Sequence, residues 1–193
     1  MRRTLSGAIY ALSTLLGALA LLYPLLIRSP WAAAQGLQAR SAPLATAALV
    51  GLSLLALLVE VQGESIGAKT VAMLGVLVAI TSVLRFIEVL LPMPGGFSPI
   101  FAPILLASYV FGARFGFQMG VYTIVVSALI TGGVGPWLPY QMLVTGWVGM
   151  SAGGLRLLPW KRLRQGACGR PEVGLLAAMG VAWGFLFGAL TNL

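Results

Sequence analysis

Long apolar runs, separated by short stretches rich in Gly, Pro and charged residues, dominate the sequence. Several of these runs reach the roughly 20 residues with which a helix crosses the hydrocarbon core of a bilayer. The short alternating segments typical of a transmembrane β-barrel are not found. The pattern predicts an all-α fold, a polytopic membrane helix bundle of about seven transmembrane helices, over residues 7–27, 43–59, 66–86, 100–111, 117–130, 138–155 and 173–190.

The first run could also belong to a signal peptide. It follows the basic residues Arg2 and Arg3 and precedes the small-residue stretch Ala32–Ala34, which resembles a cleavage site. The apolar run over 7–27, however, is longer than the roughly 7–15 residues of a secretory apolar region. We therefore expect a retained transmembrane helix.

The composition supports a membrane protein and argues against catalysis. Hydrophobic residues make up 59% of the chain and charged residues 8%, whereas about a quarter of the residues of a soluble domain are charged. The sequence has no His and no Asp, and its four carboxylate side chains are Glu60, Glu64, Glu88 and Glu172. A phosphate-binding loop and a metal motif are missing as well. We therefore expect no catalytic residues, no metal and no cofactor, and the single Cys168 excludes an intrachain disulfide.

The net charge of +8 is best explained by cytoplasmic loops rather than by nucleic-acid binding. With a cytoplasmic N-terminus and seven helices, nine of the twelve basic residues lie inside, five of them between Arg156 and Arg170. The positive-inside rule favours this orientation in the cell membrane. Two loops, Leu91–Pro99 and Gly132–Gln141, then lie on the external side.

The loop Gly132–Gln141 has three glycines and two prolines in ten residues, so we expect it not to be helical. It is either a simple helix connection or the edge of a binding site. Aromatic residues lie in or beside both loops. They form either an aromatic belt at the membrane interface or stacking surfaces for a flat ligand.

Arg85 and Glu88, three residues apart, are either interfacial anchors or part of a ligand cavity. The candidate substrate-binding residues are Arg85, Glu88, Phe97, Ser98, Phe101, Trp137, Tyr140 and Gln141.

Small residues form a stripe along one face of the third predicted helix, residues 66–86. Five of them fall within an arc of roughly 80° at 100° per residue. Such a face allows close approach of another helix, either of a partner subunit or of the same chain. The stripe consists of Ala68, Ala72, Gly75, Ala79 and Ser82.

Three sequence motifs carry a resemblance to a known family. LPMPGGFSP (Leu91–Pro99), YVFGARFG (Tyr109–Gly116) and GGVGPWLPYQMLVTGWVG (Gly132–Gly149) look like those of substrate-binding S components of energy-coupling factor (ECF) vitamin transporters. The similarity extends from about Ile66 to Leu193. It implies a six-helix core without catalytic activity, which binds a vitamin or precursor externally. It also implies two kinds of partner, a transmembrane coupling (T) subunit and two ABC ATPases, with Ala68, Ala72, Gly75 and Ala79 docking the T subunit.

The chain departs from this pattern in two ways. Residues 1–62 form an extra N-terminal pair of transmembrane helices, and residues 63–193 hold only five of the six expected core helices. Either the sequence is truncated at its C-terminus or the site is built differently. The leading hypothesis is a substrate-binding subunit of an ECF-type importer, with cobalamin as the first substrate candidate and riboflavin or hydroxymethylpyrimidine next. The alternative is a structural or assembly subunit of the membrane without a small-molecule ligand.

Overall fold

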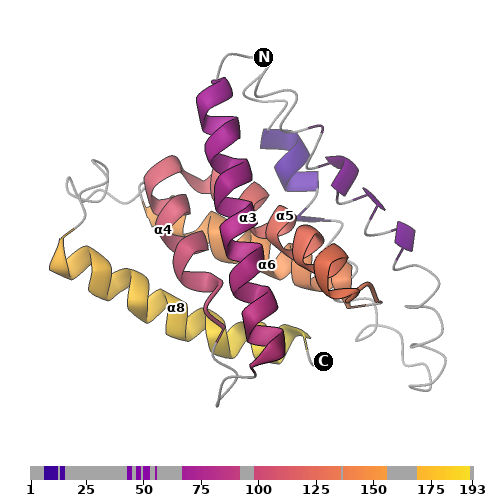
Figure 1. The fold of residues 1–193 in the computed structure, drawn as a ribbon. Coiled ribbons are helices and arrows are strands. Elements are labelled where there is room, and N and C mark those ends of the chain that lie inside the picture. Colours follow the sequence, from indigo (N-terminus) through magenta and orange to yellow (C-terminus); the bar gives the residue numbers. More distant parts are fainter. Residues whose placement is uncertain are drawn as a thin grey trace, which may run out of the picture.

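A computed structural model describes residues 7–12, 14–15, 43–44, 47–48, 50–52, 55, 67–91, 98–135, 137–155 and 169–191. Every regular element among these residues is a helix, and the predicted all-α membrane bundle is confirmed (Figure 1). The longer helices are α3 (Ala68–Leu90), α4 (Phe101–Phe111), α5 (Ala113–Thr131), α6 (Leu138–Gly154) and α8 (Arg170–Thr191).

Three of these helices are long and apolar enough to cross a membrane. They are α3, α5 and α8, while α4 is apolar but shorter. Of the two expected N-terminal helices, the structure describes helical pieces within 7–15 and 43–55. The rest of that region, including Ala32–Ala34, lies outside the described residues.

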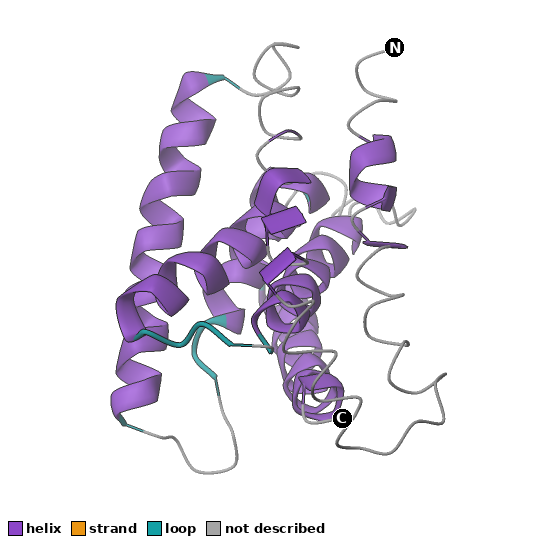
Figure 2. Cartoon of the chain, turned by 90° about the vertical axis from the view of Figure 1, so that its right-hand side faces the viewer, coloured by secondary structure: helices purple, strands orange, loops and turns teal. Residues whose placement is uncertain are grey.

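Helices α5 and α6 form the centre of the bundle. They pack closely along one another, α3 packs on α5, and α4 packs on both α5 and α6. Helix α8 contacts α4 and α6 and slants across the lower part of the view in Figure 1, whereas α3 stands nearly upright there. Figure 2 shows α3 along one side of this central pair.

Glycines set the distance between α5 and α6. A Cβ atom on Gly149 would lie 2.1 Å from the carbonyl oxygen of Gly116, and one on Gly120 would lie 2.3 Å from the carbonyl oxygen of Thr145. A Cβ on Gly153 would likewise lie 2.1 Å from the backbone nitrogen of Ala113. Backbone therefore lies directly on backbone. Small residues allow this close approach. In lipid, where no hydrophobic effect drives helices together, the resulting van der Waals contact stabilises their association.

The turn between α4 and α5 is shorter than the sequence suggested. Gly112 alone interrupts the two helices, with φ of 103°, and α5 begins at Ala113. The predicted helices over 100–111 and 117–130 left residues 112–116 as a tight turn, which is wrong except at Gly112, because Ala113–Gly116 is already helical. Only Gly tolerates such a φ without a steric clash of its side chain, so a single residue completes the reversal.

The loop after α5 is also shorter than expected. Gly132 ends α5 in the left-handed region, with φ of 68°, and α6 begins at Leu138. The predicted start of a helix at residue 138 is correct, whereas the expectation that the whole of Gly132–Gln141 is non-helical is wrong for its last four residues. Pro139 fits in the first turn of α6 because the backbone N–H groups there have no intrahelical partner to lose.

Candidate functional site

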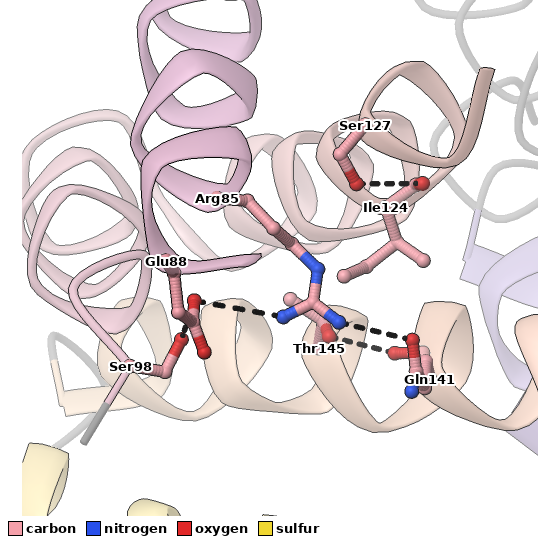
Figure 3. A network of polar contacts seen from close by, with 7 residues as sticks. All are labelled: Arg85, Glu88, Ser98, Ile124, Ser127, Gln141 and Thr145. Atoms are coloured by element: carbon pink, nitrogen blue, oxygen red, sulfur yellow. Dashed lines mark hydrogen bonds and ion pairs between the residues drawn. The ribbon is translucent and has the colours of Figure 1, made fainter. Parts of the chain in front are cut away.

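Four of the predicted site residues meet in one polar network (Figure 3). The Arg85 Nη2 donates a hydrogen bond to Gln141 Oε1 at 3.2 Å. Arg85 Nη1 lies 3.7 Å from Glu88 Oε2, and the Ser98 hydroxyl donates to that same oxygen at 2.7 Å. The network joins the C-terminal part of α3, the entry to α4 and the first turn of α6.

Local structure explains how these side chains come together. Arg85 and Glu88 lie three residues apart on α3, so they share one helix face. Because α3 continues to Leu90, both lie within its last two turns. Gln141 is held in the first turn of α6, where the Thr145 hydroxyl donates to its carbonyl oxygen at 2.6 Å.

The network is partly shielded from solvent and carries no net charge. The side chains of Arg85 and Glu88 are 17% and 20% exposed. Glu88 Oε1 and the Gln141 amide nitrogen have no hydrogen-bond partner among the described residues. The cluster therefore still offers one strong acceptor and one donor to an incoming polar group.

The other predicted residues are placed differently. Phe101 is 5% exposed and packs edge-to-face on Phe187 of α8, with ring centroids 5.3 Å apart. Trp137 is 51% exposed, and its indole lies so close over Gly135 that a Cβ there would be 2.4 Å from the ring. Tyr140 is half-buried beside Gln141. Phe97 lies outside the described residues, as does most of the loop before Ser98.

An apolar groove lies next to the network, between α4 and α8. It has a volume of about 500 Å³, within the roughly 300–1,000 Å³ of small-molecule sites. Among the described residues that line it, Ser98 alone carries a hydroxyl group, and this is the residue that hydrogen-bonds Glu88. The lining consists of Ser98, Phe101, Ala102, Leu105 and Leu106, with Val173, Leu176, Ala177, Gly180, Val181, Gly184 and Phe185 from α8.

The sequence analysis missed the contribution of α8. Its lining positions recur at intervals of three and four residues from Val173 to Phe185, the spacing of a single helix face. That spacing was visible in the sequence. What the sequence did not show was that α4 would lie opposite this face.

The small-residue stripe of α3 divides into two parts. Ala68, Ala72, Gly75 and Ala79 are exposed, and a Cβ on Gly75 would meet nothing within 4 Å. Ser82 is instead buried and donates to the Thr123 carbonyl of α5 at 3.3 Å. The four predicted docking residues thus form a smooth surface beside the face that packs on α5.

The described residues contain no group of three or more His, Cys, Asp or Glu side chains that could hold a metal ion. The arrangement offers hydrogen bonds, one ion pair and an apolar groove. These are features by which proteins bind small molecules.

Comparison with known proteins then identifies the family. A family model described as "ECF transporter, substrate-specific component" matches residues 69–193. The chain belongs to this family. No curated protein and no solved structure matches the chain.

The resemblance predicted from the motifs is thereby confirmed. This S component is the substrate-specific membrane subunit of an ECF importer, a transporter component rather than an enzyme. Membership of the family implies a small-molecule substrate and a partnership with a T subunit and ATPases. The matched residues include all five longer helices except the first residue of α3.

Proposed function

We propose that this S component captures a vitamin or vitamin precursor at the polar network of Arg85, Glu88, Ser98 and Gln141. The observation that carries the proposal is the convergence of three separate chain segments on Glu88 and Arg85. Ionisable groups are costly at membrane depth and mark functional sites when they face a cavity. Here they lie beside one, since Ser98 belongs both to the network and to the groove lining.

The network is proposed to face the external side of the cell membrane. The nine-to-three distribution of basic residues supports a cytoplasmic N-terminus, because basic loops are retained inside. Arg85 and Glu88 then lie near the external end of α3. The substrate would arrive at this end, and transport would be energised by the partner ATPases.

Among the candidate substrates, the groove favours the smaller ones. A volume of about 500 Å³ suits a molecule of the size of riboflavin or hydroxymethylpyrimidine. Cobalamin, with its corrin macrocycle and nucleotide loop, would extend far beyond the groove. We therefore rank the flat heterocycles above cobalamin.

The exposed stripe of α3 is proposed to dock the T subunit. Ala68, Ala72, Gly75 and Ala79 provide a surface without protruding side chains, which suits close helix packing in lipid. The exposure of these four residues supports the proposal, because nothing in the described bundle covers them.

Binding is tested with purified protein in lipid nanodiscs, by calorimetry with riboflavin, hydroxymethylpyrimidine and cobalamin and by mass spectrometry of co-purified ligand. Glu88→Gln is expected to weaken binding about 10- to 100-fold, because hydrogen bonds to a charged group contribute about 1.5–3 kcal/mol. Glu172→Gln serves as the matched control on α8, outside the network. No co-purified ligand and no binding across the panel would leave the alternative, a structural or assembly subunit.

Docking is tested separately by Gly75→Leu and Ala79→Leu. Because a side chain at Gly75 enters open space, ligand binding should survive while transport with the T subunit and ATPases is lost. Val76→Leu is the control, since Val76 is exposed on α3 but lies off the stripe. Loss of ligand binding in the two stripe variants would assign the stripe to internal packing instead.

A further inference from the structure

The α4–α8 groove combines a wide apolar surface with small residues along its floor. Val181 and Phe185 are 64% and 79% exposed at its rim. Gly180 approaches α4 closely, since a Cβ there would lie 3.6 Å from Leu105 Cδ1. A Cβ on Gly184 would meet nothing within 4 Å. The groove is therefore open where a side chain could have filled it.

The polar network adjoins this groove through one residue. Ser98 contributes to the groove lining, and its hydroxyl is bound to Glu88 Oε2 at 2.7 Å. A molecule lying along α4 and α8 thus reaches the network as it passes Ser98. The polar network and the apolar groove are therefore continuous through Ser98.

From this continuity we infer that the substrate is amphipathic, with a compact hydrogen-bonding head at the network and an apolar body in the α4–α8 groove. The inference rests on the proposed function, and it specifies the class of substrate. The reason is that the substrate must match both surfaces. A wholly polar vitamin would leave the apolar groove unfilled, and a wholly apolar one would remove water from Glu88 and Arg85 without replacing its hydrogen bonds.

The network also specifies the head. Arg85 and Glu88 neutralise each other, so the site has no net charge to attract an ion. Glu88 Oε1 accepts a hydrogen bond and the Gln141 amide nitrogen donates one. The complementary head is uncharged and carries both a hydrogen-bond donor and an acceptor, as in a carboxamide, a ureide or the edge of a heterocyclic ring.

The inference is tested with a homologous series of primary amides from butanamide to octanamide. Each has the same donor–acceptor head, and the members differ only in apolar length. Affinities for the full chain in nanodiscs are measured against free aqueous concentration, with empty nanodiscs subtracted. Because a buried methylene contributes about 0.8 kcal/mol, each added methylene should tighten binding by up to about fourfold.

Matched substitutions locate the apolar body. Ala177 and Ala178 are adjacent, exposed alanines of α8, but only Ala177 lines the groove. Ala177→Leu and Gly184→Leu should remove the dependence on chain length, whereas Ala178→Leu should retain it. Glu88→Gln should weaken every amide by a similar factor, because all share the same head.

Each result separates the possibilities. A vitamin from the panel that binds equally to wild type and Ala177→Leu, together with no chain-length effect, would overturn the amphipathic substrate while leaving the proposed function intact. A phospholipid that co-purifies with the wild type and with Glu88→Gln, but not with Ala177→Leu, would assign the groove to lipid. That result would also overturn the amphipathic substrate. If neither amides nor vitamins bind, the proposed function falls together with the inference.

Discussion

The contact between Gly149 and Gly116 gives the sharpest test of how the bundle is built. Replacing Gly149 by Ala adds one methyl group at a point where its carbon would lie 2.1 Å from the Gly116 oxygen and 2.3 Å from the Gly116 carbonyl carbon. Ordinary van der Waals contact begins at 3.4 Å. Since the opposing atoms belong to a helix backbone, they have no rotamer with which to move aside, and the two helices must separate.

The expected loss of stability is at the upper end of the range for overpacking. Inserted methyl groups in a packed core cost about 1–3 kcal/mol. Separating α5 from α6 also weakens the contacts at Gly120 and Gly153, each atom pair being worth about 0.1–0.2 kcal/mol. We expect Gly149→Ala to lower the free energy of unfolding by about 3 kcal/mol.

The measurement is reversible unfolding by sodium dodecyl sulfate in mixed micelles, followed by circular dichroism. The control is Gly154→Ala on the same helix, where an added Cβ meets nothing within 4 Å. That variant should be within about 0.5 kcal/mol of wild type. Equal stability of Gly149→Ala and wild type would refute the close approach of α5 and α6.

Three further substitutions probe single contacts. Trp183→Phe removes the 2.8 Å hydrogen bond from the indole to the Ser151 hydroxyl, which joins α8 to α6. It should lower the free energy of unfolding by about 0.5–1 kcal/mol in the same assay, and an unchanged value would mean that the bond is not formed. Gln118→Met should raise the free energy of unfolding by about 1 kcal/mol, because both amide atoms of the fully buried Gln118 lack a hydrogen-bond partner within the described part of the chain. A decrease in stability would contradict this and point to a partner for the amide. Gly132→Ala should lower the free energy of unfolding by about 1 kcal/mol, since an L side chain is strained at φ of 68°. An unchanged unfolding midpoint would contradict the left-handed conformation of Gly132 at the end of α5.

The helices were predictable because they depend on the length of the apolar runs in the sequence. Runs of apolar residues predicted α4 and α6 almost to the residue and placed α3, α5 and α8 within a few positions. The errors fall at Ala113–Gly116, where the predicted helix began too late, and at Leu138–Gln141, which the glycines and prolines of the loop led us to expect as non-helical. One glycine with positive φ completes the first turn, and the first turn of a helix tolerates proline, so both connections are shorter than composition suggests.

The polar part of the candidate site was also visible in the sequence, but the groove was not. Arg85 and Glu88 stood out because charged residues are scarce, and Ser98 and Gln141 because they are hydrogen-bonding residues of the two loops expected outside. Which of them touch depends on how α3, α4 and α6 cross, and helical periodicity does not contain that information. The face of α8 shows the right spacing, yet only tertiary packing brings it opposite α4.

The backbone contact between α5 and α6 has a consequence for movement. Two helices joined through glycines have little room to slide, because any shift brings carbonyl oxygens onto neighbouring backbone atoms. Helices α3 and α8, in contrast, are tied to the pair through side-chain bonds such as Ser82 to Thr123 and Trp183 to Ser151, which can break and re-form. Spectroscopic labels placed on α5 and α6 should therefore keep one fixed separation through a transport cycle, and changes in distance should appear only toward α3 or α8.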